Sequence, residues 1–85
     1  MPNKHISEDD QAFLKDVGQR LRLERLRQQL RQADIAALLG KGDRSGQQAI
    51  RLMEAGRQNI PLPTYLSWCD ALGVEPWELI GWRNQ

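Results

Sequence analysis

Hydrophobic residues recur at helical spacing along most of the chain, and the first run predicts a long helix. Ser7, followed three residues later by Asp10, approximates a capping box at its start, and the helix is expected to end near Gln29. Gly18 costs about 1 kcal/mol relative to alanine inside a helix, which indicates close packing against a neighbour. The apolar stripe on the buried side consists of Phe13, Leu14, Val17, Leu21, Leu26 and Leu30.

Two shorter helices follow, joined by a turn that contains two glycines. The first covers residues 31–39 and ends at Gly40. Its apolar positions are Ile35, Ala36, Leu38 and Leu39. After the turn, Ser45 is expected to cap the next helix in a capping box with Gln48, and Gly56 ends that helix. The core-facing positions of this helix are Ala49, Ile50 and Met53.

Two further helices complete the pattern. Pro61 and Pro63 suit the entry of a helix that ends at Gly73. Its expected buried residues are Leu62, Tyr65, Leu66, Cys69 and Leu72. Pro76 begins a last short helix, ended by Gly81, that contains Trp77, Leu79 and Ile80. No run alternates polar residues with Val, Ile and Thr, so the prediction is an all-α fold, a compact five-helix bundle.

Length and composition narrow the class of protein. The 85 residues are expected to form one domain, 1–85, with its core at about residues 8–81. One cysteine and one histidine give neither a disulfide framework nor a zinc pattern, and Cys69 is expected to be a small core residue. No segment resembles a signal peptide or a membrane span, which favours a cytoplasmic location. Without paired carboxylates, a nucleophile–base set or a phosphate loop, we expect no enzyme activity, no cofactor and no metal.

The charge of the chain is segregated along its length. The formal net charge is only +1, but residues 20–57 carry nine lysines and arginines against four aspartates and glutamates, a net charge of +5. The remaining residues carry three against seven, a net charge of −4. This segregation favours a basic surface for a polyanion around the two short helices. A solvated, arginine-rich helix surface is the alternative.

Two adjacent glutamines lie at the start of the third predicted helix. The amide of Gln47 or Gln48 can donate and accept hydrogen bonds at once, which suits the edge of an adenine. Arg51 lies one turn later on the same side and can form a fork with a guanine, contact a phosphate or face solvent. On these residues alone, an exposed helix start explains the glutamines equally well.

Several short motifs occur in a fixed order between residues 17 and 80. They are Arg22 with Arg25, the stretch LRQADIA at 30–36, the set Ile50, Glu54 and Gly56, and the stretch ALGV at 71–74 followed by Leu79 and Ile80. Together they resemble the Cro/CI (Xre) family of helix-turn-helix repressors, whose fold is λ-repressor-like. The chain departs from the family in a longer turn at residues 41–44, in Leu52 where some relatives have a base-contacting polar residue, and in Glu24 at an often apolar position.

The resemblance implies roles in DNA binding. Gln47 and Gln48, with Arg51 beside them, are expected to contact bases from a recognition helix at about residues 45–55 in the major groove. Gln32, at a helix N-terminus that presents free N–H groups, is expected to bind the DNA backbone. The other expected phosphate contacts are Arg31, Lys41, Arg44, Ser45, Arg57 and Asn59.

The same resemblance pairs Arg25 with Glu54. In the family these positions form a buried ion pair between the first and third helices. Removing one partner of such a pair costs about 3–5 kcal/mol when both are buried.

The function that the resemblance implies is repression of transcription by covering a promoter. One short helix reads too few base pairs, so we expect a homodimer on a palindromic operator of double-stranded DNA, with half-sites about 34–36 Å apart. Exposed aromatic residues at a chain end suggest a partner surface, and the candidate dimer interface is Trp77, Ile80 and Trp82. A tryptophan that lies flat on its own domain is the alternative.

Two further interpretations stay open. The length, the long turn and the tryptophan-rich end also resemble the Kor-type (KorC-like) repressors of broad-host-range plasmids, which implies association with the nucleoid or a plasmid. The competing functional class is a protein-binding module, such as a toxin–antitoxin antitoxin or a polymerase co-regulator. Its spare segments are short, which makes the antitoxin interpretation the weaker one.

Overall fold

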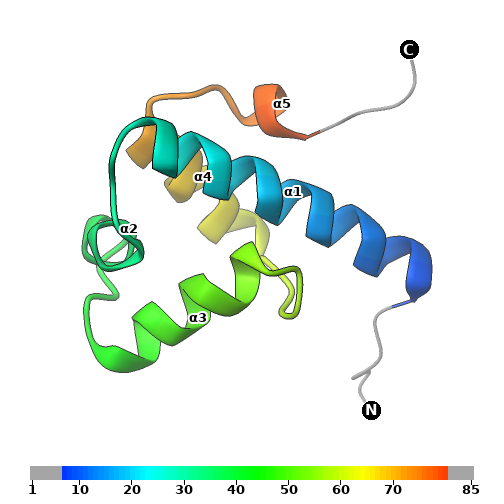
Figure 1. Cartoon of the computed structure of the whole chain (residues 1–85), viewed down its shortest axis with the longest axis horizontal. Coiled ribbons are helices and arrows are strands. Elements are labelled where there is room, and N and C mark those ends of the chain that lie inside the picture. The colour runs from blue at the N-terminus through cyan, green and yellow to red at the C-terminus, as the bar shows by residue number, and fades with distance from the viewer. Residues whose placement is uncertain (1–6, 81–85) are drawn as a thin grey trace.

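The computed structural model describes residues 7–80, and within this range the chain forms helices and no strands. The helices in chain order are α1 (Glu8–Arg27), α2 (Gln32–Leu38), α3 (Arg44–Glu54), α4 (Leu62–Leu72) and α5 (Pro76–Leu79). The all-α fold class with five helices is therefore confirmed. Figure 1 shows α1 lying along the molecule, with α3 beside it and α2 at one end. The expected helix end at Gly81 lies outside the described residues.

The helix starts follow from side chains that satisfy free N–H groups. Ser7 caps α1 as predicted, because its Oγ accepts a hydrogen bond from the backbone N–H of Asp10 at 3.1 Å. The prediction that Ser45 caps α3 is wrong. The helix begins earlier, and the Asp43 carboxylate accepts from the N–H of Gly46 at 2.7 Å. Ser45 lies inside the first turn, where its side chain is past the capping position.

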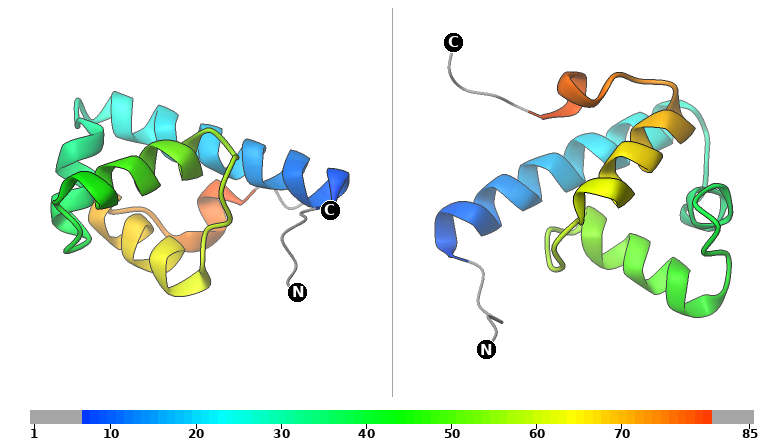
Figure 2. Two further views of the ribbon diagram at one scale, coloured as in Figure 1. Left: turned by 90° about the horizontal axis from the view of Figure 1, so that it is seen from below. Right: turned by 180° about the vertical axis from the view of Figure 1, so that it is seen from behind.

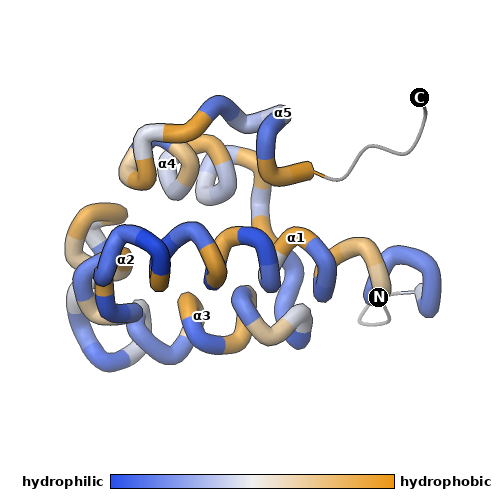
Figure 3. Tube along the Cα trace, turned by 45° about the horizontal axis from the view of Figure 1, so that its top comes forward, coloured by the Kyte–Doolittle hydropathy of each residue, from blue (hydrophilic) through white to orange (hydrophobic). Residues whose placement is uncertain are grey.

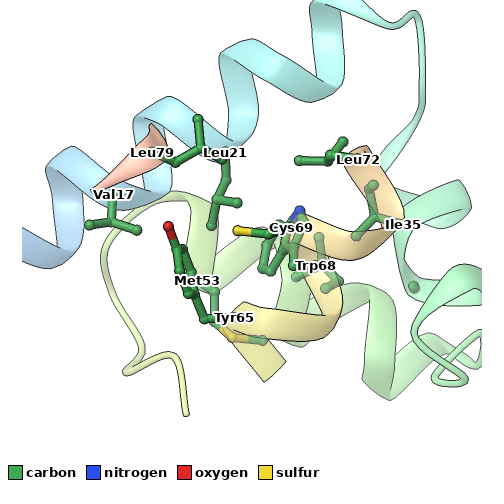
Figure 4. Close-up of a cluster of buried hydrophobic side chains, with 11 residues drawn as sticks. Val17, Leu21, Ile35, Met53, Tyr65, Trp68, Cys69, Leu72 and Leu79 are labelled. Carbon is green, nitrogen blue, oxygen red and sulfur yellow. The ribbon is translucent and has the colours of Figure 1, made fainter. Parts of the chain in front are cut away.

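The core is built from all five helices. Its fully buried large side chains are Leu21, Ile35, Ile50, Trp68 and Cys69. Figure 4 shows the cluster, with side chains from all five helices converging on the interior. Burial raises the pKa of the Cys69 thiol, so this residue stays protonated and fills space, as expected of a core cysteine.

Several leucines and a phenylalanine that were expected in the core are exposed instead. They are Phe13, Leu26, Leu38, Leu62 and Leu66, with exposed fractions from 43% to 66%. Helix lengths explain Phe13: α1 has 20 residues and α3 has 11, so the first turns of α1 extend beyond the helices packed on it, as Figure 2 shows. The other four side chains lie on helix sides that no neighbouring helix covers.

Gly18 is the point of closest approach between α1 and α3. A Cβ built at this position would lie 2.5 Å from the carbonyl oxygens of Met53 and Glu54. No side chain fits at that distance, so the close packing predicted from the sequence is confirmed. The last turn of α3 consequently lies directly on the middle of α1.

Gly18→Ala is expected to destabilise the fold by about 1–3 kcal/mol, because the new methyl group would push the α3 backbone away. This outcome is opposite to the usual gain of about 1 kcal/mol when alanine replaces glycine in a helix. Urea denaturation followed by circular dichroism measures the free energy of unfolding. Gly42→Ala is the control, since its Cβ would meet Ala37 at an ordinary 3.6 Å. Equal stabilities of the two variants would contradict the prediction.

Candidate nucleic-acid interface

Two short helices and the turn between them pack together as one unit. The Lys41 N–H donates to the Ala36 carbonyl at 2.7 Å, which closes the end of α2. The turn then folds back onto the start of α3, where Gly46 is buried against it. A Cβ on Gly46 would lie 1.8 Å from the Lys41 carbonyl oxygen, so only glycine permits this contact. The long turn is therefore packed against α3.

A buried hydrogen-bond network joins the other end of α3 to α1 and α2. Arg25 of α1 donates two bonds to the Glu54 carboxylate, from Nε at 2.7 Å and from Nη2 at 2.9 Å. Its Nη1 donates to the Leu30 carbonyl at 2.9 Å. The Gln32 amide of α2 donates to Glu54 Oε1 at 3.0 Å. Because Arg25 and Glu54 are both buried, this Arg25–Glu54–Gln32 network fixes how the three helices cross.

The side of α3 that faces away from the core carries the predicted base-contacting residues. Gln47, Gln48 and Arg51 are all exposed, while Ile50 and Glu54 point inward. The Gln47 amide donates to the Gly42 carbonyl at 3.4 Å. The Arg51 Nε donates to the Gln48 carbonyl oxygen Oε1 at 3.3 Å. Within residues 7–80, the terminal nitrogens of Arg51 donate no hydrogen bond, and its side chain is exposed.

The predicted phosphate contacts lie at both ends of α3. Lys41, Arg44 and Ser45 are exposed on the turn and first residues of α3, and Arg57 and Asn59 are exposed on the loop after it. The Asp43 carboxylate occupies the N–H of Gly46, so an anion at the very start of α3 would meet a negative charge. The cationic side chains are therefore the better phosphate ligands at this end.

Two predicted phosphate contacts have partners within the protein. Gln32 is half-buried, and its amide donates to Glu54. Arg31 precedes α2 and forms an ion pair with Asp34 at 3.0 Å. The Arg31 side chain and its backbone N–H both donate to that carboxylate and lower the pKa of Asp34. A phosphate at Arg31 must therefore share the guanidinium with Asp34.

The opposite side of the molecule is acidic and partly apolar. Residues 58–80 contain Asp70, Glu75 and Glu78 and neither lysine nor arginine. Figure 3 shows that α4 also carries more hydrophobic positions than α3. Of the candidate dimer residues, Trp77 is 71% exposed, Ile80 packs partly against the core, and Trp82 lies outside the described residues.

The structure also brings together a set of residues that the sequence reasoning missed. Lys15, Gln19 and Arg22 of α1 line an open groove of about 400 Å³ with Gln32 and Arg51. The spacing of these three residues could have predicted that they lie together, since positions i, i+4 and i+7 lie on one side of a helix. Among residues 7–80, no group of three or more His, Cys, Asp or Glu side chains is placed to hold a metal. Nor is any helix in this range long and apolar enough to cross a membrane.

Two packed short helices, with polar side chains projecting outward from the second, define a DNA-binding domain of the helix-turn-helix class. The family model described as helix-turn-helix domain matches residues 16–79, and the chain belongs to this family. Domains of this class bind DNA, mainly in the regulation of transcription. No curated protein and no solved structure matches the chain.

Arg25→Ala is expected to lower the free energy of unfolding by about 3–5 kcal/mol, because it leaves the Glu54 carboxylate buried without its charged partner. Thermal denaturation would detect this as a large drop in melting temperature. Arg27→Ala is the matched control: Arg27 belongs to the same helix, and its side chain is 69% exposed where it pairs with Glu24, so the melting temperature should barely change. A similar small effect for Arg25→Ala would show that the buried pair is not stabilising.

Proposed function

We propose that the chain is a sequence-specific transcriptional repressor of the Cro/CI (Xre) type, which binds double-stranded DNA with α3 in the major groove. The observation that carries the proposal is the exposed polar face of α3 on a helix clamped at both ends. Gly46 and Asp43 hold its start, and the Arg25–Glu54–Gln32 network holds its last residue. A recognition helix must present its side chains to bases in one fixed orientation.

Base reading falls to Gln47, Gln48 and Arg51. The Arg51 guanidinium can donate two bonds to the O6 and N7 atoms of a guanine. Its Nε bond to Gln48 limits the rotamers of both side chains, which reduces the entropy lost on binding. The Gln48 amide nitrogen stays available for an acceptor on a neighbouring base. Gln47 keeps its amide oxygen available for a base donor, since its nitrogen contacts the turn.

Backbone binding falls to the residues around the two ends of α3 and the start of α2. Lys41 and Arg44 approach one strand from the turn, and Arg57 with Asn59 approaches from the loop after α3. Gln32, Arg31 and Ser45 complete this set. Such contacts set the register of the protein on the duplex and make the affinity fall steeply with salt.

A homodimer on a palindromic operator follows from the small number of bases that one helix reaches. Trp77, Ile80 and Trp82 are the proposed dimer interface, and the 71% exposure of Trp77 supports this role. The acidic side formed by α4 and α5 lies away from the exposed cations at the two ends of α3. A dimer formed through α4 and α5 therefore leaves the α3 of each subunit accessible to DNA. Repression of a plasmid promoter, as in KorC-like repressors, is the biological setting that we propose.

Gln48→Ala and Gln47→Ala are each expected to weaken binding to a site selected from random DNA by about 5- to 100-fold, the effect of losing one specific base contact. Affinity for random-sequence duplex should stay nearly unchanged, because that binding depends on phosphates. Fluorescence anisotropy measures both affinities. Ser67→Ala, which truncates an exposed polar side chain on α4, is the control. An equal loss on both duplexes would remove the glutamines from base reading.

Trp77→Ala is expected to raise the dimer dissociation constant at least about tenfold, as loss of a central interface tryptophan does. Sedimentation velocity over a range of protein concentrations measures the monomer–dimer equilibrium. Leu23→Ala removes a 52%-exposed leucine from the outer side of α1 and should leave the equilibrium unchanged. A wild-type protein that sediments as a monomer, or a Trp77→Ala variant that dimerises normally, would refute the interface.

A further inference from the structure

The groove beside α3 is built from three helices. Its α1 wall contains Lys15, Gln19 and Arg22, and its α3 wall contains Arg51 and Glu54. Gln32 of α2 and Ala55 also line it. The Gly18 contact holds the two walls close together, because it leaves no side chain between α1 and α3. The groove is open to solvent along its length, which suits a group that is part of a longer chain.

The groove has an excess of positive charge that the protein does not neutralise. Elsewhere in the described residues, Arg20 and Arg27 form ion pairs with carboxylates of α1, the helix to which they belong. Arg31, just before α2, pairs with a carboxylate in the first turn of α2. Lys15, Arg22 and Arg51 form none within residues 7–80. The one carboxylate that borders the groove, that of Glu54, is already bound by Arg25. An anion entering the groove therefore meets three available cations.

The polar groups of the groove match the oxygens of a phosphate. Gln32 uses one amide hydrogen for Glu54 and retains the second for an acceptor in the groove. Arg22 offers a planar fork of donors that fits two phosphate oxygens. Sites for drug-sized ligands of this volume are lined mainly by apolar and aromatic side chains, whereas Ala55 is the single apolar residue that lines this groove and the other six lining residues are polar or charged.

The position of Arg51 connects the groove to the recognition face. Arg51 belongs both to the wall of the groove and to the exposed row that contains Gln48. If α3 lies in the major groove of DNA, one of the two strands that border it therefore runs beside the opening of the protein groove. We propose that the groove binds one backbone phosphodiester of that strand through Arg22, Lys15 and Gln32. This inference rests on the proposed function and adds α1 to the DNA-binding surface.

The test is the salt dependence of binding to a random-sequence duplex, measured with the full chain. Each phosphate contact contributes about 0.9 to the slope of log K against log salt concentration. Arg22→Gln and Lys15→Gln should each reduce the slope by up to this amount and weaken binding at low salt. Arg20→Gln removes the same charge from the same helix, away from the groove, and should leave the slope unchanged. Circular dichroism confirms that all variants remain folded.

Two results would overturn the assignment. If Arg22→Gln and Lys15→Gln have the slope of the wild type, the groove does not contact the backbone, although the proposed function stands. If the wild type binds no duplex, the proposed function itself fails and the assignment fails with it.

A second binding measurement distinguishes a backbone phosphate from a free phosphate ion. Inorganic phosphate is titrated into the wild type at constant ionic strength, and amide shifts around the groove are followed by NMR. The proposal expects no saturation in the millimolar range, since a lone ion lacks the neighbouring duplex contacts. Saturable shifts that Arg22→Gln abolishes, together with an unchanged salt slope on DNA, would assign the groove to a free anion instead.

Discussion

The bidentate bond between Arg25 and Glu54 is the constraint on which the rest of the molecule depends. Burying two opposite charges is costly unless every donor and acceptor finds a partner. Here the Arg25 guanidinium also binds the Leu30 carbonyl, and the Glu54 carboxylate also accepts from Gln32. All three guanidinium nitrogens of Arg25 and both carboxylate oxygens of Glu54 thus have partners, and this geometry requires α1, α2 and α3 to meet in one arrangement. Such a pair sets the position of α3 more than it adds to stability.

A second contact, at Gly18 of α1, fixes the direction of α3 as well as its position. Gly18 lies seven residues before Arg25, on the same side of α1, and brings the Met53 and Glu54 carbonyls against the α1 backbone. At the other end, Gly46 packs against Lys41 and Asp43 caps the helix. With both ends held, α3 cannot rotate about its own axis, so the outward row is determined by which residues must face inward. The outward position of Gln48 and Arg51, on which their proposed role in base reading depends, is consequently set by buried residues.

The sequence alone predicts those features that depend on local spacing. Ser7 as a cap and Gly18 as a close contact followed from residues within one or two turns. Local spacing does not predict which part of an apolar stripe finds a neighbour, and Phe13 and Leu62 are exposed for that reason. Asp43 and Ser45 are both good capping residues, and the path of the chain out of α2 decides between them. Pairing across 29 residues, as between Arg25 and Glu54, came from the family resemblance and has no local signal.

The length of α3 and the position of the cations together bear on how the domain would meet a duplex. Eleven residues at about 1.5 Å each make a helix about 16 Å long, and the major groove is about 12 Å wide. Lys41 lies before this helix, Arg44 is its first residue and Arg57 lies after it, so in the proposed complex they face the two strands that border the groove. The longer turn does not loosen this arrangement, because Gly46 fixes the turn to α3. In the proposed complex, its extra residues place Lys41 and Arg44 beside one strand, while the cationic groove between α1 and α3 lies along the side of the same helix.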